Sequence, residues 1–168
     1  MELFLLRHAI AVMRGTPGYA DDSKRPLTPE GARKMRRVAE GMRALGIEFD
    51  VMLSSPFIRA KQTAEIVAEI FGDARKVSFD NGLAVGGDHH ELIDRINKEY
   101  GMTKAILLVG HEPSMSELIS VLLAGDPGLS ITLKKGGLCK LSVVESLRYG
   151  RCATLDWLLA PKHLTGLA

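Results

Sequence analysis

The chain has 168 residues, of which 46% are hydrophobic and 25% charged, with a formal net charge of +2. A chain of this length can bury most of its apolar surface, and we expect residues 1–168 to form a single domain. The small net charge does not indicate a nucleic-acid partner. Two cysteines, Cys139 and Cys152, are too few for a disulfide framework, and we expect both to be buried, reduced thiols.

The N-terminal segment predicts a buried strand and no membrane partner. Four consecutive apolar residues, 3–6, precede Arg7. A membrane-spanning helix needs ~20 apolar residues, and the core of a signal peptide is also longer than four. A short apolar run without alternation is typical of a strand covered on both faces. We therefore expect a cytoplasmic protein that begins with such a strand.

A polar loop over about residues 14–25 leads to the first predicted helix. Thr28 can cap this helix, Pro29 suits its first turn, and Glu30 favours the positive end of the helix dipole. Apolar residues at three- and four-residue spacing continue until Gly46, which can end the helix. The opposite side is interpreted as a solvated helix face, and its basic residues are Arg33, Lys34, Arg36, Arg37 and Arg43.

Strands and helices alternate along the rest of the chain. Further strands are predicted at residues 51–53, near Val77, and at residues 105–109, 138–144 and 152–159. Further helices are predicted to begin at Ser55-Pro56, near Leu92 and at Pro113. This alternation predicts an α/β fold, a three-layer sandwich whose central sheet is mostly parallel and carries helices on both faces.

Polar side chains follow three of the predicted strands. His8 follows the first strand, His111 follows the strand at 105–109, and Ser55 begins the helix in which Arg59 lies one turn further. Ligands bind beyond the carboxyl ends of such strands. Arginine and a helix N-terminus bind phosphate, and a neutral histidine can attack phosphorus. Taken singly, these residues are also explained as a strand rim, a loop histidine and a helix surface residue.

Three segments resemble the signatures of the histidine phosphatase superfamily. Residues 5–9 resemble its Arg-His-Gly signature, residues 54–64 its second signature, and residues 109–113 its third. Residues 24–28, the short chain and the absence of a large inserted lid are similar to SixA-type phosphohistidine phosphatases. The resemblance implies a phosphoglycerate mutase-like fold and a phosphatase that uses neither a metal nor an organic cofactor.

The resemblance also implies roles for individual residues. His8 is expected to become phosphorylated and then to be hydrolysed. The phosphoryl group and its transition state are expected to be bound by Arg7, Arg59 and His111. Arg25 is expected to reach the mouth of the pocket as a further substrate-binding residue. These residues speak against a non-catalytic phosphate-binding protein that has lost its chemistry.

Two departures from the family pattern bear on activity and substrate. Ala9 replaces the usual glycine, and we expect activity to survive if its φ is negative. Residues 80–88 contain no glutamate, whereas many relatives that act on alkyl phosphates carry one in the corresponding region. An alcohol leaving group needs a proton in the transition state. The leaving groups of phosphohistidine and phosphoanhydrides depend less on such a proton. The alternative proton donors in the sequence are Asp80, Asp88, His89 and Glu112.

The favoured hypothesis is therefore a phosphatase that acts on phosphohistidine in a protein. The alternative within the enzyme class is a small-molecule phosphatase or phosphoanhydride hydrolase. The expected partner is accordingly a phosphorylated protein or a small phosphorylated molecule, and neither a nucleic acid nor a membrane. Residues 88–91 hold two adjacent histidines between acidic residues, and we interpret them as a solvated loop and helix cap rather than a metal site.

Overall fold

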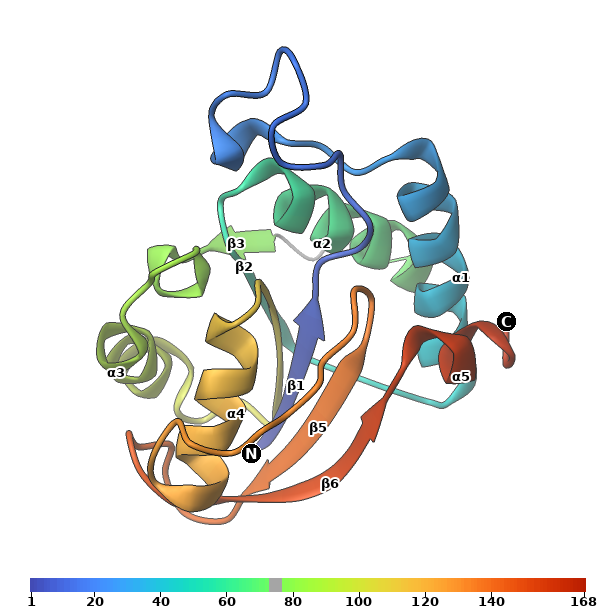
Figure 1. Cartoon of the computed structure of the whole chain (residues 1–168). Coiled ribbons are helices and arrows are strands. Elements are labelled where there is room, and N and C mark those ends of the chain that lie inside the picture. Colours follow the sequence, from blue (N-terminus) through green and yellow to red (C-terminus); the bar gives the residue numbers. More distant parts are fainter. Residues whose placement is uncertain (73–76) are drawn as a thin grey trace.

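The computed structural model describes residues 1–72 and 77–168 and contains a six-stranded sheet between layers of helices (Figure 1). The strands are β1 (Glu2–Arg7), β2 (Val51–Ser54), β3 (Val77–Phe79), β4 (Ala105–Gly110), β5 (Leu138–Val143) and β6 (Ala153–Leu159). The helices are α1 (Pro29–Ala44), α2 (Ile58–Phe71), α3 (His89–Tyr100), α4 (Ser114–Ala124) and α5 (Pro161–Thr165). Two 3-10 turns are η1 (Asp22–Lys24) and η2 (Asn81–Leu83).

The strand order is β3-β2-β4-β1-β5-β6, with the first four strands parallel to one another. β5 runs antiparallel to β1, and β6 runs antiparallel to β5. In the centre of the sheet, Leu5 of β1 lies opposite Leu108 of β4 on one side and Cys139 of β5 on the other. The predicted three-layer α/β sandwich with a mostly parallel sheet is thus confirmed.

Alternate residues of β1 build two separate cores, because successive side chains of a strand point to opposite faces. Phe4 and Leu6 belong to the core beneath α1, α2 and α5. Leu3 and Leu5 belong to the core beneath α3 and α4. Figure 1 shows these two helix groups on opposite faces of the sheet. Burial on both faces explains why β1 has the continuous apolar run seen in the sequence.

The predicted start of the first helix is confirmed. The Thr28 side chain accepts a hydrogen bond from the Gly31 N–H at 2.9 Å, and Pro29 is the first helical residue. The basic residues on the outer side of α1 are exposed, as expected for a solvated face. Among the described residues, no helix combines the length and the apolar character needed to cross a membrane.

Three details of the prediction are wrong or incomplete. Helix α2 begins at Ile58 rather than at Ser55-Pro56, because the Ser55 hydroxyl accepts from the Phe57 N–H in a turn before the helix. Arg59 is therefore the second residue of α2 rather than one turn into it. Cys139 is buried, but Cys152 is only half-buried, and both are free thiols. The short helix α5 was not predicted.

Candidate active site

The parallel strands β2, β4 and β1 are neighbours in the sheet, so their carboxyl ends meet at one edge. Ser55 follows β2, His111 follows β4, and His8 follows β1. The rings of His8 and His111 lie 5.0 Å apart between their centroids. Arg59, from the start of α2, reaches the same place, with its Nε 3.3 Å from His8 Nε2. The structure thus brings together two histidines and an arginine that are far apart in the sequence.

His8 is buried and its tautomer follows from one hydrogen bond. Its Nδ1 lies 2.7 Å from the Ala9 carbonyl oxygen, which can only accept, so Nδ1 carries the proton. Burial lowers the pKa of His8 to about 2, and the positive charges of Arg59 and Arg7 act in the same direction. The ring is therefore neutral at physiological pH, with an unprotonated Nε2 beside the Arg59 guanidinium.

Ala9 fits its position without strain. Its backbone N–H donates to the Thr63 hydroxyl at 3.1 Å, and that hydroxyl donates to the Arg59 carbonyl oxygen at 2.7 Å. The residue is buried, and among the described residues no amino acid other than glycine has a positive φ. Alanine therefore adopts the backbone of this position without a positive φ.

His111 is positioned by a hydrogen bond to Ser55. Its Nε2 lies 2.7 Å from the Ser55 Oγ, and this oxygen already accepts from the Phe57 N–H. We assign the hydroxyl proton to the bond with His111, which leaves the ring proton on Nδ1. Nδ1 is buried, and the described part of the chain offers it no hydrogen-bond partner. Burial lowers the pKa of His111 to about 3, with Arg59 adding to the effect, so the ring presents a neutral N–H donor.

Two arginines, the half-buried Arg7 and the buried Arg59, supply the positive charge of the site. Arg7 donates from one terminal nitrogen to the Leu133 carbonyl at 2.9 Å, while its buried Nε has no acceptor among the described residues. The Arg59 side chain is only 2% exposed. Burial lowers the pKa of both guanidinium groups, yet arginine stays charged in proteins. The unused Nε–H of Arg7 and the desolvated charge of Arg59 favour an anion at this place.

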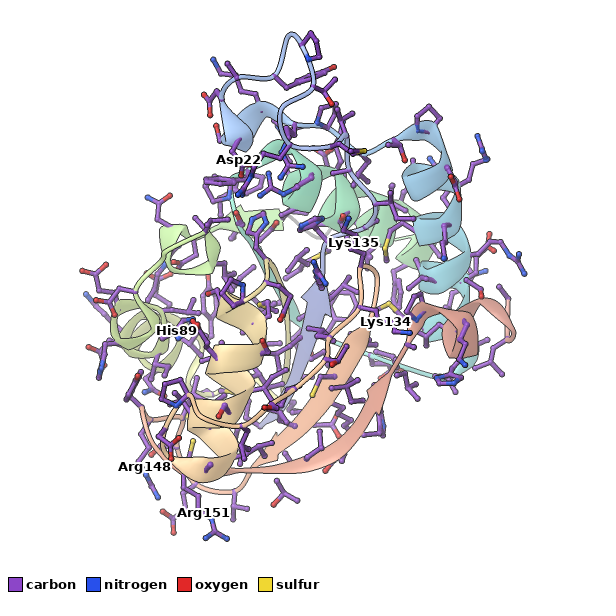
Figure 2. All side chains as sticks on the ribbon, viewed as in Figure 1. Asp22, His89, Lys134, Lys135, Arg148 and Arg151 are labelled. Atoms are coloured by element: carbon purple, nitrogen blue, oxygen red, sulfur yellow. The ribbon has the colours of Figure 1, made fainter. Side chains whose placement is uncertain are left out.

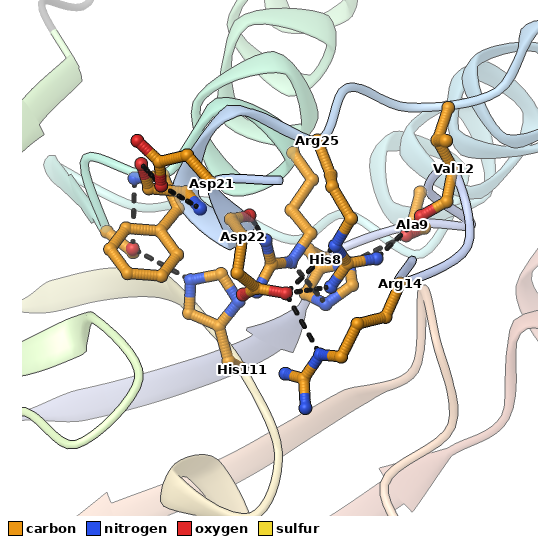
Figure 3. Close-up of polar contacts among 12 residues, drawn as sticks. His8, Ala9, Val12, Arg14, Asp21, Asp22, Arg25 and His111 are labelled. Atoms are coloured by element: carbon orange, nitrogen blue, oxygen red, sulfur yellow. Dashed lines mark hydrogen bonds and ion pairs between the residues drawn. The ribbon is translucent and has the colours of Figure 1, made fainter. Parts of the chain in front are cut away.

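Arg25 and Arg14 join the same cluster of side chains through the carboxylate of Asp22 (Figure 3). Asp22 accepts from Arg25 Nε at 2.9 Å and from a terminal nitrogen of Arg59 at 2.9 Å. Arg14 donates to the same carboxylate at 3.1 Å. Sequence reasoning missed Asp22 and Arg14, because it treated this segment only as a polar loop. No signal marked Asp22, since an acidic residue contradicts the charge expected of a phosphate pocket.

Two of the alternative proton donors have structural roles. Asp80 accepts from the Gly82 N–H at 2.7 Å and pairs with Arg95 at 2.9 Å. Asp88 caps α3 by accepting from the first backbone N–H groups of that helix. The residues after Asp88 point in different directions, since His90 stacks on Tyr149 with ring centroids 3.7 Å apart. The predicted helix cap is confirmed, and in the described ranges no three His, Cys, Asp or Glu residues are grouped to hold a metal.

The other two alternative donors are also bonded elsewhere. Both carboxylate oxygens of Glu112 accept from Ser116, one from its backbone N–H and one from its hydroxyl. His89 Nε2 lies 2.8 Å from the Ser114 hydroxyl. None of these bonds is directed at His8. The two carboxylates of residues 80–88, Asp80 and Asp88, thus act in capping and ion pairing, and Glu112 and His89 are bonded to serines.

Exposed lysines lie near the cluster. Lys134 and Lys135 are exposed on the turn before β5, and the next residue, Gly136, donates its backbone N–H to the Arg7 carbonyl at 3.1 Å. Figure 2 shows both lysines near the end of β1 and places Arg148 and Arg151 at the opposite end of the molecule. The positive charge around the cluster therefore continues onto the surface beside it.

Comparisons with known proteins show which family the chain resembles. The model of the histidine phosphatase superfamily (branch 1) matches residues 3–84. An uncharacterised protein of Picosynechococcus sp. is 36% identical over 142 residues, which cover 84% of each chain. The phosphohistidine phosphatase SixA of Escherichia coli (strain K12) is 26% identical over 167 residues, covering 98% of this chain and 96% of SixA.

A solved structure of the protein histidine phosphatase SixA complexed with tungstate matches with a TM-score of 0.82. The match covers 98% of this chain and 99% of that chain at 23% identity, and it confirms the expected phosphoglycerate mutase-like fold.

Proposed function

Because the chain belongs to the histidine phosphatase superfamily and is a phosphatase, we propose that it works through a phosphorylated His8 and that its preferred substrate is phosphohistidine on a protein. One observation carries the proposal. His8 is buried and neutral, its Nδ1 is fixed by the Ala9 carbonyl, and its unprotonated Nε2 faces Arg59. This is the state that a nucleophilic imidazole needs.

The first step transfers the phosphoryl group to the enzyme. The Arg59 Nε–H gives up its hydrogen bond to His8 Nε2 and turns to a phosphoryl oxygen, Nε2 attacks phosphorus, the P–Nε2 bond forms, and the bond to the leaving group breaks. Arg7 and Arg59 balance the negative charge on the equatorial oxygens, and the Nδ1–H of His111 donates to one of them. The arrangement is preorganised, because Arg59 and His111 are buried, Arg7 is half-buried, and each of the three is held by a second residue.

The second step returns the enzyme to its starting state. A water molecule attacks phosphorus, the P–Nε2 bond breaks, and His8 leaves as a neutral ring because its Nδ1 keeps the proton. The proton lost by the water passes to solvent or to the phosphate product. The Ala9 carbonyl holds the same tautomer throughout, so the ring is ready for the next substrate.

The substrate preference rests on the leaving group. The carboxylates of residues 80–88 cap helices or pair with Arg95, and Glu112 binds Ser116. Without a positioned acid, an alkoxide would have to leave unprotonated, which is slow. The imidazole of phosphohistidine leaves as a neutral ring once its other nitrogen carries a proton from water. The relative from E. coli is named as a phosphohistidine phosphatase, which supports the same choice.

A small phosphoanhydride is the second candidate, and Arg14 favours it. The Arg14 side chain is 76% exposed and lies 3.1 Å from the Asp22 carboxylate at the mouth of the pocket. A cation at that position suits a second phosphate group attached to the one under attack.

The proposed cytoplasmic location stays a prediction from the sequence.

The nucleophile is tested by trapping the intermediate. Wild type, His8→Ala and His163→Ala are mixed with radiolabelled substrate in the presence of EDTA and quenched within milliseconds. His163 is an exposed histidine on α5 and serves as the matched control. We expect base-stable, acid-labile label on wild type and His163→Ala and none on His8→Ala. Label on His8→Ala, or activity that persists in this variant, would refute the assignment of His8 as the nucleophile.

The leaving-group argument is tested with a series of aryl phosphates of increasing phenol pKa. A site without a general acid predicts that kcat/KM falls steeply as the phenol becomes more basic. A flat dependence would reveal a positioned acid and refute the argument. A phosphohistidine peptide, a sugar phosphate and pyrophosphate are then compared directly. The proposal predicts that the phosphohistidine peptide has the highest kcat/KM, and a preference for sugar phosphate would contradict it.

A further inference from the structure

Asp22 places a carboxylate among the arginines that the mechanism assigns to the phosphoryl group. One carboxylate oxygen accepts from Arg59 at 2.9 Å, and the other accepts from Arg25 at 2.9 Å and from Arg14 at 3.1 Å. The backbone oxygen of Asp22 accepts from Arg59 as well, at 2.7 Å. Figure 3 shows this carboxylate between His111 and Arg14. Asp22 therefore contacts the donors of Arg59, Arg25 and Arg14 directly.

The contacts of Asp22 are the contacts that a phosphate would make. Guanidinium groups bind planar oxygen pairs of carboxylates and phosphates with the same fork of donors. Desolvation by burial raises the pKa of Asp22, but hydrogen bonds from Arg25, Arg59 and Arg14, together with the charge of Arg59, lower it to about 2. The carboxylate is therefore ionised at physiological pH, which excludes it as a proton donor to a leaving group.

We propose that the Asp22 carboxylate competes with phosphate for the donors of Arg59 and Arg25. A phosphoryl group displaces the carboxylate when it binds, and the carboxylate returns to the two arginines when phosphate leaves. A carboxylate carries a single negative charge, whereas a phosphoryl monoester or phosphoramidate carries up to two. The exchange therefore favours dianionic phosphoryl groups over carboxylates and phosphodiesters. It also weakens the binding of the phosphate product and assists its release.

The structure of the loop allows this exchange. Asp22 begins the three-residue turn η1, in which no residue is buried, and its side chain is 31% exposed. The turn is capped by Asp21, whose carboxylate accepts from the Ser23 N–H and hydroxyl rather than from the pocket arginines. The Asp22 side chain can thus leave the pocket while its backbone oxygen still holds Arg59.

The test is the affinity for inorganic phosphate, measured by calorimetry on wild type, Asp22→Asn and Asp21→Asn at low ionic strength. Asparagine keeps the size of the side chain and one acceptor oxygen but removes the charge. We expect Asp22→Asn to bind phosphate about tenfold more tightly than wild type, equivalent to ~1.4 kcal/mol. Asp21→Asn changes the same charge in the same turn outside the pocket, and its affinity should stay within about twofold of wild type.

The sign of the change separates competition from a merely positioning role. If Asp22 only orients Arg59 and Arg25, the substitution loosens both, and phosphate binds more weakly. Weaker or unchanged binding in Asp22→Asn therefore overturns the proposal. Asp22→Ala provides a second variant, and a thermal melt of each protein shows that it is folded. In steady-state assays, competition also predicts a lower KM for an aryl phosphate and stronger inhibition by phosphate.

This inference rests on the proposed function only for the identity of the ligand. Calorimetry with inorganic phosphate needs no turnover. If the wild-type protein is inactive but Asp22→Asn binds phosphate more tightly than wild type, only the catalytic proposal is refuted. An active protein with unchanged phosphate affinity in that variant would refute the role of Asp22 alone.

Discussion

Replacing His8 with glutamine should make the protein less sensitive to acid. Burial lowers the pKa of His8 to about 2 and that of His111 to about 3, whereas an unfolded histidine titrates near 6.5. Because both folded pKa values are depressed, the stabilisation is present above pH 6.5 and is lost as the pH falls towards about 3. At pH 5 the unfolded histidine is almost fully protonated, and each buried neutral ring therefore costs the fold ~2 kcal/mol.

This magnitude does not depend on the depth of the pKa shift. At pH 5 any folded pKa below about 4 gives nearly the same loss, because only the unfolded state binds the proton. The two rings together account for ~4 kcal/mol between pH 7 and pH 5, and removing His8 should leave about half of that. His89, whose pKa burial also lowers, contributes equally to wild type and variant.

The assay is urea denaturation of wild type, His8→Gln and His163→Gln at pH 7 and pH 5. His163 is exposed, so its variant should lose as much stability as wild type. His8→Gln should lose ~2 kcal/mol less, whatever its stability at pH 7. If all three proteins lose the same free energy of unfolding, His8 carries a proton in the folded state at pH 5. That result would refute the claim that His8 is neutral in the folded protein, and it would do so without any measurement of activity.

Three further substitutions test separate parts of the structure. Arg59→Lys should lower kcat/KM for an aryl phosphate ~100-fold, since a lysine cannot contact His8 and bind oxygens with a planar fork; a loss below about fivefold would contradict this. In Gly41→Ala, the new Cβ would overlap the Leu164 backbone oxygen, so urea titration should show a loss of ~1–3 kcal/mol, and an unchanged midpoint would argue against the α1–α5 contact. Ala9→Gly should keep kcat/KM within about twofold but lower the unfolding free energy by ~1 kcal/mol; a large gain in activity would show that alanine strains the site.

The sheet and most helices could be predicted because each has a local signature. Strands β1 and β4 are buried on both faces and read as unbroken apolar runs, while Thr28-Pro29 marks the start of α1. The same cap-and-proline signal misplaced the start of α2, since a serine hydroxyl stabilises a turn as readily as a helix. Helix α5 has five residues, too few for a periodic pattern to appear.

The residues at the strand ends could be anticipated, but their partners could not. The convergence of His8 and His111 follows from strand order, which the alternation of elements and the family resemblance both constrain. The bond between Ser55 and His111 depends on the turn before α2, and the contacts of Asp22 depend on the path of the loop before α1. A loop path is determined by many weak tertiary contacts, which leave little trace in composition or periodicity.

The charges of the pocket link binding to chemistry. Burial lowers the pKa values of both histidines and the arginines add to the effect, which leaves the His8 ring neutral and His111 with a single ring proton. The Asp22 carboxylate acts on His111 in the opposite direction and raises its pKa. A phosphoryl dianion that replaces Asp22 brings more negative charge to the same place, and this strengthens the hydrogen bond from His111 Nδ1. The donor is thus strongest when the phosphoryl group is bound, and the site needs no separate acid to become electrostatically complementary to its substrate.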